Sequence, residues 1–237
     1  MKVLVVRGSP RKNGATARLA DLFVRGLRGG GAEVFDADLT SLKISPCLGC
    51  FHCVRSGGVC ALRDDMRGLL ETFAASDALV CASPVYFYSM SAQTKAFFDR
   101  CFPLVRGYAY DAEKGRCACI AASARKKLIT IGAASGRISS FDALSKTYAA
   151  IADSMNMEYA ADIRRGETPY FGALGARSAR VRRILDSFVE AGRAFAETGA
   201  IPSATVAAAE SEIAENDRVF ASRSKIFWEL LKNGKTF

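Results

Sequence analysis

The stretch Lys2–Thr16 constrains the fold of this chain more than any other part of its sequence. Val3 to Val6 form an unbroken apolar run, which suits a strand buried on both faces of a parallel sheet. Pro10, in the polar turn that follows, has no backbone N–H and cannot continue the strand. From Ala15 onward, apolar residues recur three or four positions apart, as on the buried face of a helix. The stretch therefore predicts a buried strand, a short polar turn and an amphipathic helix.

Strand and helix patterns continue to alternate along the chain. Four more apolar segments have the length of strands: residues 32–35, 78–82, 128–131 and 158–163. Helical spacing of apolar residues occurs between and after them, at 66–73, in a segment that begins at Ser89 or Ser91, at 141–155, and at 181–189 with its end at Gly199. This alternation predicts an α/β fold with a doubly wound five-stranded parallel sheet.

Two segments fall outside the alternation. Residues 106–124 follow neither pattern, and we expect a long surface excursion there. A C-terminal extension, residues 200–237, follows the predicted sheet domain of residues 1–199 and is rich in apolar residues from Asn216 onward. So much apolar surface is unusual in a free tail. We expect the extension to pack on the core or on a neighbouring subunit, and we therefore expect a homo-oligomer.

Composition and charge narrow the functional classes. The 237 residues carry a formal net charge of +9, but the basic residues are spread along the chain and are not interleaved with aromatic residues. Nucleic-acid binding is therefore not expected. There is no run of about 18 apolar residues and no signal-peptide pattern before the first strand. We expect a cytoplasmic protein with no membrane partner.

The turn after the first strand gathers groups that bind anions. Ser9 and Thr16 supply hydroxyl groups, Asn13 an amide and Arg11 a positive charge, while Gly14 frees the backbone where the helix begins. A helix N-terminus presents free N–H groups and the positive end of the helix dipole. The turn lacks the Gly-Lys-Ser/Thr of a P-loop and the three glycines of a dinucleotide fingerprint. It suits a single phosphate group; an ordinary strand–helix turn is the alternative.

Two further loops are expected at the same edge of the sheet. In doubly wound sheets, ligands bind beyond the carboxyl ends of the strands, where the strand order reverses. A flat redox-active ring needs apolar faces, nearby backbone donors and small residues that let it approach. The loop after the third strand offers Pro84, Val85, Tyr86 and Phe87, and the loop after the fourth offers Gly132 and Ala133. The alternative is that the two aromatic residues belong to the core.

Taken together, several motifs resemble the NADPH-dependent FMN reductase family of flavodoxin-like proteins. They run in order from Met1 to about Ile163: Gly8-Ser9-Pro10-Arg11, Asn13-Gly14 with Thr16, Asp64-Asp65-Met66, Ser83-Pro84-Val85-Tyr86, and Lys95 with Asp99-Arg100. The resemblance implies a flavodoxin-like fold that binds FMN, with the phosphate on the turn from Ser9 to Thr16 and the ring against Pro84–Phe87. Ala15 stands where the family usually has Asn, which removes one amide from the phosphate site. We expect weakened binding, because the backbone donors remain.

Four of the eight cysteines crowd into the loop 46–61. Cys47, Cys50, Cys53 and Cys60 are separated by two, two and six residues. This spacing resembles that of the iron–sulfur flavoprotein family, which implies a 4Fe–4S cluster on the four thiolates. A structural zinc site that uses His52 and a loop without metal are the alternatives. Because the loop follows the second strand, we expect it at the same sheet edge as the flavin loops. Cys81 lies in an apolar strand, which predicts core packing.

These features predict an FMN-dependent NAD(P)H oxidoreductase, or an electron-transfer protein of the iron–sulfur flavoprotein type. A nicotinamide nucleotide is the expected reductant. No Ser/His/Asp triad or carboxylate pair is present, so the redox chemistry is assigned to the cofactor and no side chain is predicted to be catalytic. One alternative is an electron carrier that a redox protein such as ferredoxin reduces, without NAD(P)H activity of its own. Another is a binding protein stabilised by zinc.

Overall fold

A five-stranded parallel sheet forms the centre of the molecule. The computed structural model describes residues 1–113, 116–121, 125–171 and 178–234. The sheet has the order β2-β1-β3-β6-β7. Its strands are β1 (Lys2–Arg7), β2 (Glu33–Asp38), β3 (Ala78–Pro84), β6 (Lys127–Ala133) and β7 (Glu158–Arg165). All neighbouring pairs are parallel, which confirms the predicted flavodoxin-like doubly wound sheet.

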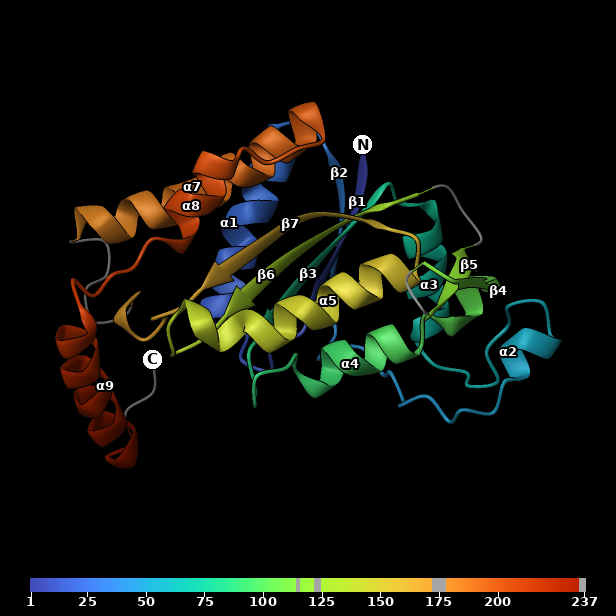
Figure 1. The fold of residues 1–237 in the computed structure, drawn as a ribbon, viewed down its shortest axis with the longest axis horizontal. Coiled ribbons are helices and arrows are strands. Elements are labelled where there is room, and N and C mark those ends of the chain that lie inside the picture. The colour runs from blue at the N-terminus through green and yellow to red at the C-terminus, as the bar shows by residue number, and fades with distance from the viewer. Residues whose placement is uncertain (114–115, 122–124, 172–177, 235–237) are drawn as a thin grey trace.

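Helices cover both faces of the sheet (Figure 1). Helices α1 (Ala15–Gly29) and α7 (Ala179–Thr198) lie on one face. On the other face lie α3 (Met66–Ala75), α4 (Ala92–Asp99) and α5 (Asp142–Ser154). Successive residues of a strand point to opposite faces, so Val3 and Val5 join the core under α1, while Leu4 and Val6 join the other core. This explains why β1 is apolar at consecutive positions.

The segment after α4 differs from the expectation. A 3₁₀ turn (Phe102–Leu104) leads into a two-stranded antiparallel sheet of β4 (Val105–Asp111) and β5 (Arg116–Ala121). Most of the surface excursion expected at 106–124 is thus a β-hairpin; residues 114–115 and 122–124 lie outside the described residues. The strands were not predicted because Gly107 and the small residues of this segment weaken the strand pattern in the sequence. The hairpin forms because its two segments pair with each other, which a local pattern does not reveal.

The remaining helices are not part of the strand–helix alternation that builds the sheet. They are α2 (His52–Arg55) in the cysteine loop, the 3₁₀ turn Ile138–Phe141, α8 (Ser203–Glu210) and α9 (Asp217–Lys232). Gly199 ends α7 in the left-handed conformation, as predicted. Helix α9 lies beyond the ends of β6 and β7, on the opposite side of the molecule from α2 (Figure 1). None of the described helices combines the length and the apolar character that crossing a membrane requires.

Buried charged residues tie the C-terminal extension to the end of the sheet. Arg165, which is only 1% exposed, donates hydrogen bonds to the carbonyl oxygens of Ala209 and Ser211. Glu167 is equally buried and accepts the backbone N–H groups of Ile213 and Ala214. Burial of such charges is costly unless they are paired and hydrogen-bonded. These contacts therefore fix the chain between α8 and α9 against the carboxyl end of β7.

Candidate functional site

The turns after β1 and β3 are joined at the carboxyl edge of the sheet. The N–H of Gly8 donates to the carbonyl of Ala82, and the hydroxyl of Ser91 donates to the carbonyl of Gly8 at 2.6 Å. Ser91 also caps α4 by accepting the N–H of Thr94. A Cβ atom on Gly8 would lie 1.8 Å from the Thr94 hydroxyl, so only glycine fits here. The start of α4 is therefore held directly against the first turn.

The N-terminus of α1 is arranged to receive an anion. Gly14 is its N-cap and supplies no side-chain hydrogen bond, and its first turn contains no acidic residue. Helix N–H groups in such a turn require acceptors from elsewhere. Thr16 is 4% exposed beside them, and Arg11 lines the same cavity. Ser9 holds the turn in shape, because its hydroxyl bonds with the backbone of Arg11.

The loop after β3 is a tight turn in an uncommon conformation. Tyr86 and Ser89 exchange two backbone hydrogen bonds of 2.9 Å, and the two residues between them, Phe87 and Tyr88, have φ values of 46° and 61°. Non-glycine residues rarely adopt positive φ, and they do so at a cost of order 1–3 kcal/mol each, often at functional sites. The N–H of Val85 donates to Ala133 at 2.8 Å, which fixes the loop to the end of β6.

One cavity of about 330 Å³ connects the two regions. It brings together seven of the twelve residues predicted to bind the cofactor: Arg11, Ala15, Thr16, Pro84, Val85, Tyr86 and Ala133. Ala134 and Ser135 continue the wall after β6. Such a concave, mostly apolar space with a few polar groups is typical of small-molecule sites.

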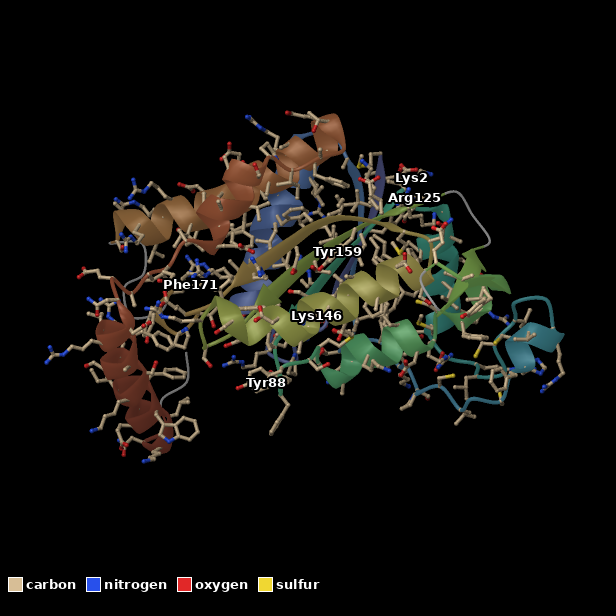
Figure 2. All side chains as sticks on the ribbon, viewed as in Figure 1. Lys2, Tyr88, Arg125, Lys146, Tyr159 and Phe171 are labelled. Atoms are coloured by element: carbon tan, nitrogen blue, oxygen red, sulfur yellow. The ribbon has the colours of Figure 1, made fainter. Side chains whose placement is uncertain are left out.

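Other predicted residues lie beside this cavity and do not line it. Ser9, Asn13 and Gly14 belong to the turn that supports it. Gly132 faces the ring of Phe141 within β6, and Phe87 is fully exposed at the tip of the strained turn. Neighbouring Tyr88 also projects from the molecule at that tip (Figure 2).

Five further lining residues belong to segments that the sequence did not place at this site. They come from the turn after β7 and from α9: Thr168, Pro169, Phe227, Trp228 and Leu231. The apolar character of the segment from Asn216 was a signal, but nothing in the sequence located it at this cavity. Contacts between segments this far apart in the chain depend on the tertiary fold.

The four clustered cysteines line a separate pocket. Cys47, Cys50, Cys53 and Cys60 border it together with Phe51, Phe102 and the end of α4. Burial raises the pKa of Cys53, and the neighbouring Cys60 and Cys47 raise it further. Among the residues that the structure describes, no three His, Cys, Asp or Glu side chains are gathered as ligands of a single ion.

The position of this pocket corrects the expectation that it shares an edge with the flavin loops. Asp99 and Arg100, at the C-terminal end of α4, line the cysteine pocket, whereas Ser91 at the other end contacts Gly8. Eight helical residues span about 12 Å. The loop leaves the carboxyl end of β2 but runs back, and its Ser45 carbonyl accepts a hydrogen bond from Arg100 at 2.7 Å. The two sites thus occupy opposite ends of α4.

Arg100 connects the cysteine pocket to the core. Its side chain is 1% exposed and makes two hydrogen bonds of 2.8 Å to the Asp64 carboxylate. The hydrogen bonds to Asp64 raise the pKa of Arg100, and the neighbouring Cys60 raises it further. A permanent positive charge beside the four thiols would favour an anionic thiolate-bound group. Cys81 is different: it is fully buried, and burial raises the pKa of its thiol to about 12.

The sequence profile of the NADPH-dependent FMN reductase family matches residues 1–157. The chain belongs to this family. An iron–sulfur flavoprotein of Archaeoglobus fulgidus is 41% identical over 103 residues, which cover 44% of this chain and 46% of that protein. An iron–sulfur flavoprotein of Methanocaldococcus jannaschii is 33% identical over 123 residues, which cover 52% and 63%. The chain therefore spans about half the length of these curated relatives.

Solved structures of the same fold include flavin enzymes. An FMN-dependent NADH-azoreductase from Bacillus anthracis, in complex with FMN, superposes with a TM-score of 0.62 at 13% identity and covers 83% of this chain and all of that one. An NAD(P)H:quinone oxidoreductase from Methanothermobacter marburgensis superposes with a TM-score of 0.57 at 17% identity, covering 82% and 96%. At such low identity these likenesses establish the flavodoxin-like fold alone.

Proposed function

We propose that this chain is an FMN-dependent NAD(P)H oxidoreductase. The observation that carries the proposal is the cavity that joins the N-terminus of α1, whose N-cap Gly14 supplies no side-chain hydrogen bond, to the loops after β3 and β6. The membership of the chain in the NADPH-dependent FMN reductase family agrees with it. Bound FMN would accept electrons from a reduced nicotinamide nucleotide and pass them to an acceptor.

The residues present fit FMN. At one end of the cavity the N–H groups of α1 with Thr16 and Arg11 would hold the phosphate, because both the dipole and the charge favour a dianion. At the other end, Pro84, Val85 and Tyr86 would contact the ring. The protein's part in the reaction is to fix the flavin and leave one face open for the nicotinamide.

Titration of the protein with FMN and with riboflavin tests the phosphate assignment. FMN should bind much more tightly, because only FMN carries the anion that α1 would receive. Equal affinities for FMN and riboflavin would show that the phosphate does not bind at this end of the cavity. Stopped-flow mixing of the FMN-loaded protein with NADH and NADPH then tests the activity, since reduction bleaches the flavin absorption band. We expect bleaching within seconds by at least one nucleotide.

For the cysteine pocket we propose a 4Fe–4S cluster on Cys47, Cys50, Cys53 and Cys60. The supporting observations are the single pocket, the adjacent Arg100 and the names of the relatives from A. fulgidus and M. jannaschii. The test measures iron, acid-labile sulfide and zinc per chain after purification without oxygen. We expect iron with sulfide. Stoichiometric zinc without sulfide would replace the cluster with a structural metal, and four titratable thiols without either would leave a metal-free loop.

One observation favours a second candidate, an electron carrier that a redox protein such as ferredoxin reduces. Apolar side chains beside the cysteines are exposed by 60% or more: Leu48, Phe51 and Val54. Exposed apolar patches of this kind mark interaction sites, with another protein or with a second copy of the chain. If neither NADH nor NADPH bleaches the bound flavin while a reduced ferredoxin does, the carrier function replaces the oxidoreductase. A homo-oligomer built on this patch would show as a larger sedimenting species.

A further inference from the structure

Helix α9 places an apolar stripe beside the proposed flavin site. Phe227, Trp228 and Leu231 line the same cavity as Arg11 and Thr16. The match to the family ends at residue 157, so this wall comes from a part of the chain that lies outside the matched residues. Trp228 is 61% exposed and Leu231 is 37% exposed. When a ligand covers large apolar side chains that are exposed next to a cavity, the burial of their surface favours binding.

Contacts within the chain fix the first half of α9 in place. Asn216 caps the helix by accepting the N–H of Val219 at 3.0 Å, and Asp217 pairs with Arg137 at 3.2 Å. Phe220 packs edge-on against Tyr170, with ring centroids 6.4 Å apart. The Tyr170 hydroxyl lies 3.3 Å from both the Phe220 carbonyl and the Ser224 hydroxyl. Helix α9 is therefore anchored on the turn after β7, next to Thr168 and Pro169 of the cavity.

The anchoring face and the cavity-lining face of α9 are one continuous stripe. Counting from Phe220, the residues Ser224, Phe227, Trp228 and Leu231 follow at i+4, i+7, i+8 and i+11. These positions lie on one side of a helix. The anchor at Phe220 and Ser224 therefore turns the remaining stripe toward the cavity. Ile226 is comparably exposed, at 58%, but does not line the cavity, which makes it a matched control.

We propose that the C-terminal half of α9, with Trp228 as its main contact, forms a wall of the FMN site in the same chain. The ligand is the flavin itself, because the stripe shares its cavity with the proposed phosphate and ring contacts; the inference thus rests on the proposed function. The wall adds contacts to bound FMN beside those of α1 and the strand loops, while one face of the flavin stays open for the nicotinamide. It thereby slows release of the flavin.

Trp228 allows a direct test, because it is the only tryptophan in the chain. Its fluorescence reports on this wall alone. In the wild-type protein, bound FMN should reduce the quenching of Trp228 by acrylamide, since the indole becomes covered. Unchanged acrylamide quenching at saturating FMN would overturn the proposal. This measurement needs no variant, so it stands even where a substitution harms folding.

Variants of Trp228 test the same contact through the affinity of the protein for FMN. Trp228→Ala should raise the Kd of FMN by about three- to tenfold, the range expected for one aromatic contact. Trp228→Phe should recover part of the loss, and Ile226→Ala should bind FMN as the wild type does. If Trp228→Ala binds FMN normally, or alters only the sedimentation coefficient, α9 is a subunit contact or a bystander and the proposal fails. Absence of FMN binding by the wild type would instead overturn the proposed function.

Discussion

At the residue scale, Thr16 is the most sharply testable contact of the proposed phosphate site. It is almost fully buried, lies in the first turn of α1 and lines the cavity. Thr16→Val keeps the shape of the side chain and removes its hydroxyl. We expect FMN binding to weaken by about 1–3 kcal/mol, because a partner of a charged group is lost. Isothermal titration with FMN measures the change.

The matched control is Thr147→Val, on α5 and away from the cavity. The Thr147 hydroxyl donates to the Ala143 carbonyl of its own helix. This variant should bind FMN as tightly as the wild type. If Thr16→Val did so too, with an unchanged melting temperature, the phosphate would have to lie elsewhere.

The buried pair Asp64–Arg100 gives a prediction about acid stability. Hydrogen bonds from Arg100 lower the pKa of Asp64 below its ordinary value. A lowered folded-state pKa contributes stability that is fully present above the unfolded value, near pH 4, and is lost as pH falls through the folded value. The melting temperature of the wild type should therefore drop below about pH 4 more steeply than that of Asp64→Asn.

At neutral pH the same substitution leaves Arg100 buried without its charged partner. Asp64→Asn should lower the free energy of unfolding by about 3 kcal/mol, as for other broken buried ion pairs. Asp99→Asn is the control, because the Lys95–Asp99 pair is exposed and should contribute less than about 1 kcal/mol. Denaturant unfolding at pH 7 compares the two. Equal small losses in both variants would contradict the role given to Arg100.

At the scale of elements, the contact between the turn after β1 and the start of α4 depends on Gly8. Gly8→Ala would force a Cβ atom into the Thr94 hydroxyl. Overpacking of this kind costs about 1–3 kcal/mol, so we expect a lower melting temperature and weaker FMN binding. Thr94→Ala removes the nearest obstructing atom, but the Ser91 hydroxyl would still lie 2.8 Å from the added Cβ atom, so the double variant should recover only part of the lost stability.

Gly68→Ala controls for the effect of adding a methyl group to a glycine. Position 68 lies in α3, and nothing stands within 4 Å of the added Cβ atom. This variant should be neutral or slightly more stable, because alanine favours the helix. A destabilisation equal to that of Gly8→Ala would mean that steric contact with Thr94 is not the cause.

The elements differ in how far the sequence could predict them. The central strands β1, β3 and β6 were predictable because strands buried on both faces read as apolar runs. The edge strands β2 and β7 are only partly buried, and they were predictable from their place in the strand–helix alternation. The hairpin of β4 and β5 was not, because its pairing is set by the partner segment. Within the site, Arg11, Thr16 and Pro84 could be found because they follow strands at a known edge of the sheet. Trp228 could not, since its position depends on how α9 docks against Tyr170.

At the scale of the whole molecule, the two sites should be separable. They lie at opposite ends of α4, and no lining residue is common to the two cavities. Cys53→Ser should therefore reduce the iron content while FMN remains bound, and NAD(P)H should bleach the flavin at the wild-type rate. Cys81→Ser, within the core, should leave the iron content unchanged. Loss of FMN from Cys53→Ser would show that the sites depend on each other.

The hydrogen bonds of Arg100 to Asp64 and to the Ser45 carbonyl matter for grafting the cysteine loop into another protein. These contacts hold both flanks of residues 46–61, one before Cys47 and one after Cys60. If the sixteen-residue loop were grafted alone into another flavodoxin-like protein, it would lack the hydrogen bonds that Arg100 makes to its flanks. Only a graft that also carries Asp64, together with an arginine at the end of the recipient's fourth helix, should assemble the four thiols there.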